Sequence, residues 1–105
     1  MERRNTIPLL CGGNMYVILV YDIAEANNGQ KRWNHIFKLC KQYLIHVQNS
    51  VFEGEISKAD LFILQSQIEK EIDPELDSVL IFKSRNERWL DKEILGMEQE
   101  DVSFI

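Results

Sequence analysis

Hydrophobic and polar residues alternate along this chain in blocks that predict both strands and helices. The first block, MYVILVYDI from Met15 to Ile23, is apolar on both faces and is expected to form a strand at the centre of a sheet. A carboxylate interrupts this block at Asp22. From Lys31 onward apolar residues recur every three or four positions, which predicts an amphipathic helix. Its expected apolar stripe is Trp33, Ile36, Phe37, Cys40, Leu44 and Val47.

The later part of the chain shows a second strand and helix pattern. HVQNSVFEGEIS, from His46 to Ser57, alternates and then shifts phase near Phe52, so it is expected to form one bent strand or a tight hairpin of two. Ser57 and Asp60 have the spacing of a capping box, which predicts the start of a second helix. Asp73-Pro74 is expected to end that helix, and DSVLIFKS then predicts a last apolar strand.

These elements together indicate an α+β fold. If the middle stretch is a hairpin, the order is β-α-β-β-α-β, the ferredoxin-like arrangement, with two helices on one face of an antiparallel sheet. A further C-terminal strand is expected at Lys92 to Met97. Because the first and last strands are apolar on both sides, we expect a partner to cover the second sheet face, most simply a second copy of the chain.

The length of 105 residues suits one domain, which we place at residues 15–97. Residues 1–14 are expected to be an extension that is either disordered or upstream of the natural start, and residues 98–105 form an acidic tail. No apolar run approaches the roughly 20 residues needed to cross a bilayer, and no secretory leader is recognisable, so a cytoplasmic location is expected.

The charge distribution bears on binding to nucleic acid. A net charge of −5 argues against binding by bulk attraction, but residues 1–52 carry six basic and three acidic side chains, against six and fourteen in residues 53–105. A local basic face is therefore possible in the first half. Its members are either a track for phosphates or the solvated side of a helix. They are Lys31, Arg32, Lys38 and Lys41.

Several side chains that can carry chemistry have a simpler interpretation. His35 and His46 lie too far apart in sequence for a helical metal pair, and both are expected at the surface or its boundary. Cys40 falls on the apolar stripe, so it is expected to pack in the core. Trp33 is also expected in the core rather than stacked on a base, while Trp89 fits either interpretation.

Four blocks carry a resemblance to a known family. They are MYVILVYDI, Lys31-Arg32, VQNSVFEGEIS and DSVLIF, in matching order and spacing. Together they resemble the small CRISPR-associated endoribonuclease family, the compact partner of the CRISPR integrase in spacer acquisition. The resemblance runs from Met15 to about Met97. It implies a ferredoxin-like homodimer, often with a C-terminal strand that crosses to the other subunit's sheet.

The resemblance also implies a site. The family's metal-binding and proposed catalytic aspartate ends its first strand, a position that Asp22 occupies here, and two copies face each other across the dimer axis with Mg²⁺ between or beside them. Mg²⁺ prefers oxygen ligands and can activate water against a phosphodiester. Tyr21, Ser50 and Phe52 match the family's motif near that site. Without the resemblance, Asp22 is more simply a strand-end residue that accepts a loop N–H.

Two compatible functions follow from the resemblance. The first is a dimeric scaffold that joins the CRISPR integrase and spans protospacer DNA during spacer acquisition. The second is a Mg²⁺-dependent endonuclease that acts without the integrase. Its substrate is either RNA, with single-stranded RNA as one alternative, or double-stranded DNA. The family includes members that serve as scaffolds, so enzyme and purely structural roles both stay open. A regulatory ferredoxin-like dimer is the third alternative.

Overall fold

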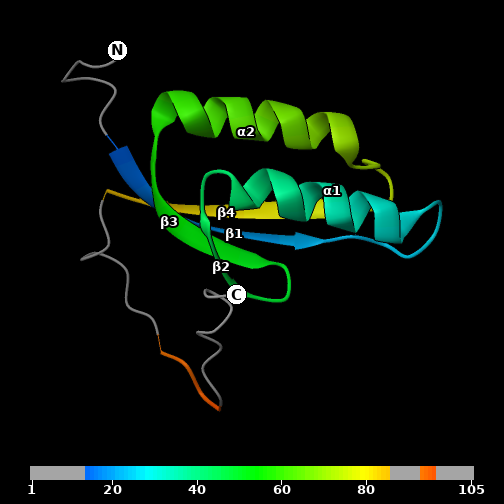
Figure 1. Ribbon diagram of the computed structural model, residues 1–105, viewed down its shortest axis with the longest axis horizontal. Coiled ribbons are helices and arrows are strands. Elements are labelled where there is room, and N and C mark those ends of the chain that lie inside the picture. The colour runs from blue at the N-terminus through cyan, green and yellow to red at the C-terminus, as the bar shows by residue number, and fades with distance from the viewer. Residues whose placement is uncertain (1–13, 86–92, 97–105) are drawn as a thin grey trace.

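The computed structural model describes residues 14–85 and 93–96 and shows the predicted order of elements (Figure 1). The strands are β1 (Asn14–Asp22), β2 (Ile45–Gln48), β3 (Val51–Ser57) and β4 (Ser78–Ser84). The helices are α1 (Gly29–Lys41) and α2 (Lys58–Glu71). All neighbouring strands are antiparallel, in the order β2-β3-β1-β4. The ferredoxin-like α+β fold is therefore confirmed.

Strand β1 lies at the centre of the sheet, as its apolar pattern predicts. Leu19 of β1 is opposite Phe52 of β3 on one side and Ile81 of β4 on the other. Side chains alternate between the two faces of a strand, so Val17, Leu19 and Tyr21 share the face beneath the helices. All three are at most 1% exposed.

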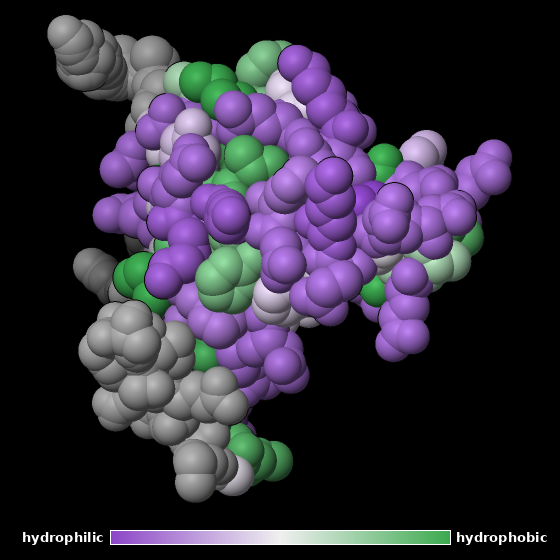
Figure 2. Space-filling model, turned by 45° about the vertical axis from the view of Figure 1, so that its right-hand side comes forward, coloured by the Kyte–Doolittle hydropathy of each residue, from purple (hydrophilic) through white to green (hydrophobic). Residues whose placement is uncertain are grey.

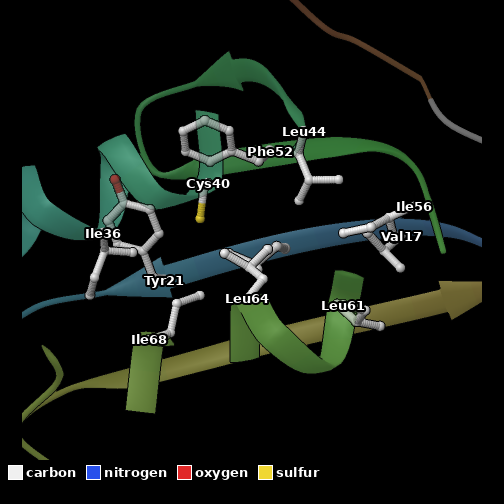
Figure 3. Packing of buried hydrophobic residues seen from close by; sticks show 11 residues of the cluster. Val17, Tyr21, Ile36, Cys40, Leu44, Phe52, Ile56, Leu61, Leu64 and Ile68 are labelled. Atoms are coloured by element: carbon white, nitrogen blue, oxygen red, sulfur yellow. The ribbon is translucent and has the colours of Figure 1, made fainter. Parts of the chain in front are cut away.

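Both helices cover the same face of the sheet, and the core lies between the two layers (Figures 1 and 3). Ile36 and Cys40 of α1 meet Leu64 and Ile68 of α2 above β1. Cys40 is fully buried, which confirms its packing role, and burial raises the pKa of its thiol to about 12. The complete buried cluster is Val17, Leu19, Tyr21, Ile36, Cys40, Leu44, Phe52, Ile56, Leu61, Leu64 and Ile68.

Helix α1 is shorter at its C-terminus than the apolar pattern predicts. It begins at Gly29, two residues before the predicted start, and ends at Lys41. The predicted continuation of its stripe to Leu44 and Val47 is wrong, because Leu44 follows the helix and Val47 belongs to β2. The two residues are three positions apart, so they fit a helical repeat by coincidence although the chain has already turned back toward the sheet.

The hairpin and the second helix agree with the prediction. Of the two alternatives for the middle stretch, the two-strand hairpin is present, with Asn49 at positive φ in its turn and an irregularity between His46 and Gln48. Ser57 caps α2, since its hydroxyl accepts a hydrogen bond from the backbone N–H of Asp60 at 3.1 Å. The helix ends before Asp73-Pro74, as expected.

The predicted C-terminal strand is described only over residues 93–96, and these four residues form no strand in the single chain. A strand that pairs with another subunit's sheet lacks its partner in one copy of the chain, which is a physical reason for the difference. The N-terminal extension up to residue 13, Cys11, Trp89 and the acidic tail lie outside the described residues. None of the helices described is long and apolar enough to cross a membrane.

Candidate functional site

Asp22 is the last residue of β1 and is exposed. Its neighbour Tyr21 points into the core, so strand alternation directs Asp22 toward the opposite face of the sheet. The residue across from it on β4 is Ser78. The carboxylate therefore lies at the end of a central strand, on the side that the helices leave open.

This open side carries a group of apolar side chains, which we call the uncovered face. Ile18 and Val20 of β1 are opposite Phe82 and Leu80 of β4, and Val20 is also opposite Val51 of β3. Leu80 and Phe82 are 56% and 55% exposed. The side of the molecule in Figure 2 is instead mostly polar, with apolar residues in separate patches. The predicted lack of a cover is thus present among the described elements.

The loop after Asp22 is held by an ion pair between Arg32 of α1 and Asp77, the residue before β4. Arg32 Nε donates to Asp77 Oδ2 at 2.8 Å, and Nη2 donates to Oδ1 at 3.1 Å. The two side chains are 12% and 0% exposed. Arg32 also donates to the backbone carbonyls of Ala24, Ala26 and Asn27. The pair therefore ties the loop to the beginnings of α1 and β4.

Asp77 is held as a carboxylate by this network. The hydrogen bonds from Arg32, and then those from the backbone N–H groups of Asp73 and Ala24, lower the pKa of Asp77 to about 2 although burial acts in the other direction. The bond from Asp77 also raises the pKa of Arg32. Arg32 was predicted in the basic track, but the structure gives its guanidinium this internal set of partners instead.

Two of the three residues predicted near the site lie in the core. Tyr21 and Phe52 are at most 1% exposed, and their rings stack with centroids 6.2 Å apart on the helix side of the sheet. Burial, and to a smaller extent Cys40, raises the pKa of Tyr21, so its hydroxyl stays neutral. Ser50 is half-buried in the turn between β2 and β3, and its backbone carbonyl accepts the N–H of Tyr21 at 3.1 Å.

The remaining basic candidates are exposed on α1. Lys31 and Lys38 are seven residues apart, about two helical turns, so they lie on the same side of the helix. The ammonium of Lys41 lies 5.9 Å from the ring centroid of Phe37. The two histidines are near the surface, as predicted, with His35 Nδ1 2.9 Å from Glu71 Oε1 and His46 Nε2 2.8 Å from the carbonyl of Asn49.

The ability of one chain to hold a metal is limited. Within residues 14–85 and 93–96, no three His, Cys, Asp or Glu side chains form a group that would hold a metal ion. Asp22 nevertheless has the oxygen donors that Mg²⁺ prefers, and it forms no ion pair with another described residue. One carboxylate per chain fits a magnesium site only if a second chain or a substrate phosphate completes the ligand set.

Sequence reasoning did not find the role of Asp77 or of the loop that it holds. Asp77 was identified only as the polar start of an apolar strand, and its partner Arg32 lies 45 residues away. The nearest signal in the sequence is a charged residue directly before a strand that is apolar on both faces, where a carboxylate needs a partner if it is buried.

The fold and this site define a small ferredoxin-like protein with an exposed carboxylate, that of Asp22, where the central strand β1 ends beside an uncovered sheet face. A family model described as "CRISPR associated protein Cas2" matches residues 15–92. The chain therefore belongs to the Cas2 family, as the resemblance in its sequence indicated.

Known relatives agree with this assignment. A protein of Fusobacterium nucleatum named "CRISPR-associated endoribonuclease Cas2" is 50% identical over 99 residues, which cover 93% of each chain. A Methanocaldococcus jannaschii protein of the same name is 37% identical over 97% of this chain and 85% of its own. A crystal structure of Cas2 superimposes with a TM-score of 0.73 at 39% identity, covering 84% of this chain and 93% of the other. Streptococcus pyogenes Cas2 gives 0.61 at 29% identity, covering 87% and 95%.

Proposed function

We propose that this chain acts as a homodimer, joined through the uncovered face, that serves as a scaffold for the CRISPR integrase and protospacer DNA in spacer acquisition. The uncovered face supports the dimer, because five apolar side chains on three adjacent strands have no covering element among the described residues. A two-fold dimer brings the same patch of both subunits together and buries it. The scaffold role and the integrase partner are extended to this chain from the family resemblance of its sequence.

We further propose that the two Asp22 side chains of the dimer hold Mg²⁺ and that the dimer cleaves RNA. The name endoribonuclease, which the relatives carry, supports phosphodiester hydrolysis. Two carboxylates brought together repel each other, and a cation between them removes that repulsion. When bound, Mg²⁺ supplies an activated water and stabilises charge on the phosphate. The chain's own contribution is to fix the carboxylate at the end of a central strand.

The observation that carries this proposal is the position of Asp22. It is exposed at the end of the same strand whose Ile18 and Val20 form the middle of the uncovered face. In the dimer that we propose, the two-fold axis passes close to the ends of the two β1 strands, so that the Asp22 side chains face each other while the uncovered face is buried. A scaffold needs only the face, whereas a metal-dependent nuclease needs both the face and the carboxylate.

The two parts of the proposal are separable by experiment. Mg²⁺ is titrated into purified protein with a labelled single-stranded RNA, comparing the wild type with Asp22→Ala and with Glu69→Ala, an exposed carboxylate on α2 that serves as the control. Cleavage by Asp22→Ala should fall by about 100-fold or more, because loss of the metal removes several kcal/mol of transition-state stabilisation. Unchanged cleavage by Asp22→Ala would show that the residue is not catalytic.

The scaffold part is tested by assembly rather than by cleavage. Wild type and Asp22→Ala are mixed with the integrase and a protospacer duplex, and complex formation is followed by size-exclusion chromatography. Both proteins should assemble equally well, because the uncovered face is intact in each. Failure of the wild type to form the complex would contradict the scaffold role. The nuclease part would then be decided by the RNA cleavage assay alone.

A further inference from the structure

We propose that the loop after Asp22 and the start of α1 form a binding site for one unstacked nucleobase of a single-stranded nucleic acid. A hollow of about 290 Å³ lies directly after the carboxylate in the chain. It is lined by Ile23, Ala24, Glu25, Gly29, Gln30 and Trp33. The inference rests on the proposed action on nucleic acid and names the part of the substrate that this chain recognises.

The size and the wall of the hollow suit a planar ring. Ligand pockets usually span roughly 300–1,000 Å³, so a hollow of about 290 Å³ fits a base rather than a longer stretch of chain. Its aromatic wall is Trp33, which is half-buried. Phe37 stacks on Trp33 with centroids 5.2 Å apart, and Tyr21 contacts it edge-on at 5.6 Å. These contacts fix the indole ring, and aromatic side chains are common platforms for unstacked bases.

The polar groups of the hollow favour a base over a phosphate. The carboxylate of Glu25 forms no hydrogen bond or ion pair with a described side chain and repels a phosphate. The amide nitrogen of Gln30 donates to Asn34 Oδ1 at 3.3 Å, so the carbonyl of the Gln30 amide can accept a further bond. Both groups are acceptors. They complement the amino groups on the edges of adenine, cytosine and guanine better than uracil, which has no amino group.

The loop that forms the hollow is built before any ligand binds. Asn27 and Asn28 both have positive φ, at 54° and 63°. Gly29 packs so close to the carbonyl oxygen of Ala24 that a Cβ at this position would lie 1.9 Å from it. Arg32 then fixes three of the loop's carbonyls. A preformed site loses little conformational entropy on binding, so a single base can be held there.

The experiment uses Trp33 itself as the reporter. The chain has two tryptophans, so Trp89→Phe leaves Trp33 as the remaining source of indole fluorescence. This protein is titrated in EDTA, which prevents metal-dependent cleavage, with a ten-nucleotide strand of adenosine and with an abasic strand of the same length. Saturable quenching by the adenosine strand, weaker quenching by a uridine strand and none by the abasic strand are expected. Equal quenching by the abasic strand, or no quenching by adenosine, overturns the proposal.

Substitutions at Trp33 give a second measurement. Binding of a labelled adenosine strand is followed by anisotropy for Trp33→Phe, which keeps an aromatic face, and for Trp33→Leu, which keeps only an apolar side chain. The Leu variant should bind on the order of tenfold more weakly than the Phe variant, as expected for loss of one stacked base. Equal affinity of the two variants contradicts stacking. The fluorescence titration needs no change at Trp33, so it decides the question even if the Leu variant is unfolded.

Failure of this inference is distinguishable from failure of the proposed nuclease. Asp22→Ala combined with Trp89→Phe should show the same quenching by adenosine as Trp89→Phe alone, because Asp22 does not line the hollow. Quenching without Mg²⁺-dependent cleavage leaves the base site and removes the nuclease. Cleavage that depends on Asp22 without any quenching leaves the nuclease and removes the base site.

Discussion

Tyr21 and Asp22 are neighbours in β1 that point to opposite faces of the sheet, one into the core and the other toward the uncovered face. The Tyr21 hydroxyl is buried and has no hydrogen-bond partner among the described residues. A buried hydroxyl without a partner costs stability. Two consecutive residues therefore contribute to different faces of the sheet, Tyr21 to the core and Asp22 to the metal site that we propose.

Replacement of Tyr21 by Phe should stabilise the protein. The substitution keeps the ring contacts with Trp33 and Phe52 and removes the unpaired hydroxyl, which should raise the free energy of unfolding by about 1 kcal/mol. Urea denaturation followed by circular dichroism measures the change. Glu69→Gln on the exposed side of α2 is the control, since an exposed substitution away from the proposed interface should stay within about 0.5 kcal/mol of the wild type. A clear loss of stability in Tyr21→Phe would mean that the hydroxyl has a partner.

The Arg32–Asp77 ion pair should make stability depend on pH in the acidic range. The folded pKa of Asp77, about 2, lies below the ordinary value of 3.8, so its contribution is complete above about pH 4 and is lost as the pH falls toward 2. Asp77→Asn should unfold at a lower temperature than the wild type at pH 6. That difference should shrink between pH 4 and pH 2. A difference in melting temperature that is constant with pH would contradict this role of the ion pair.

A charge on the uncovered face should break the proposed dimer. Phe82→Glu places two carboxylates in the interface of a two-fold dimer, and a buried unpaired charge costs several kcal/mol, equivalent to about 100-fold or more in the dissociation constant. Sedimentation equilibrium should therefore show a monomer. Phe62→Glu is the control, because Phe62 is 73% exposed on α2. A dimer that survives Phe82→Glu would place the interface elsewhere.

Reversal of charge at Lys31 and Lys38 should weaken binding to duplex DNA and reduce its dependence on salt. If each lysine contacts one phosphate, the double change to Glu should make the slope of log Kobs against log salt shallower by about 2. The matched control is Lys70→Glu in the last turn of α2. An unchanged slope would identify the two lysines as ordinary solvated residues of α1.

Local patterns in the sequence predicted most of the fold. The apolar run of β1 predicted its central position, and the spacing of Ser57 and Asp60 predicted the start of α2. The end of α1 was misplaced because Leu44 and Val47 happen to continue its repeat. Such patterns report on neighbours in the chain, so they specify helices, strands and caps better than the points where the chain reverses.

The site was predictable only in part. The resemblance directed attention to Asp22, and strand alternation gives its direction once Tyr21 is known to be buried. The ion pair of Arg32 with Asp77 was not predictable from the sequence, because the two residues are 45 positions apart and only the folded sheet brings them together. In the sequence, an exposed lysine and an arginine that pairs with a buried carboxylate occupy the same kind of position in a charged helix, so only tertiary contacts distinguish them.

The decisive measurement is of metal binding in the dimer. Mn²⁺, an oxygen-preferring substitute for Mg²⁺, is titrated into the wild type, Asp22→Asn and the interface variant Phe82→Glu, and free Mn²⁺ is followed by electron paramagnetic resonance. The wild type should bind Mn²⁺, and both variants should lose at least about tenfold in affinity, since changes beside a metal ligand already cost that much. Asp22→Asn that binds Mn²⁺ as tightly as the wild type would contradict a metal site formed by the paired Asp22 side chains.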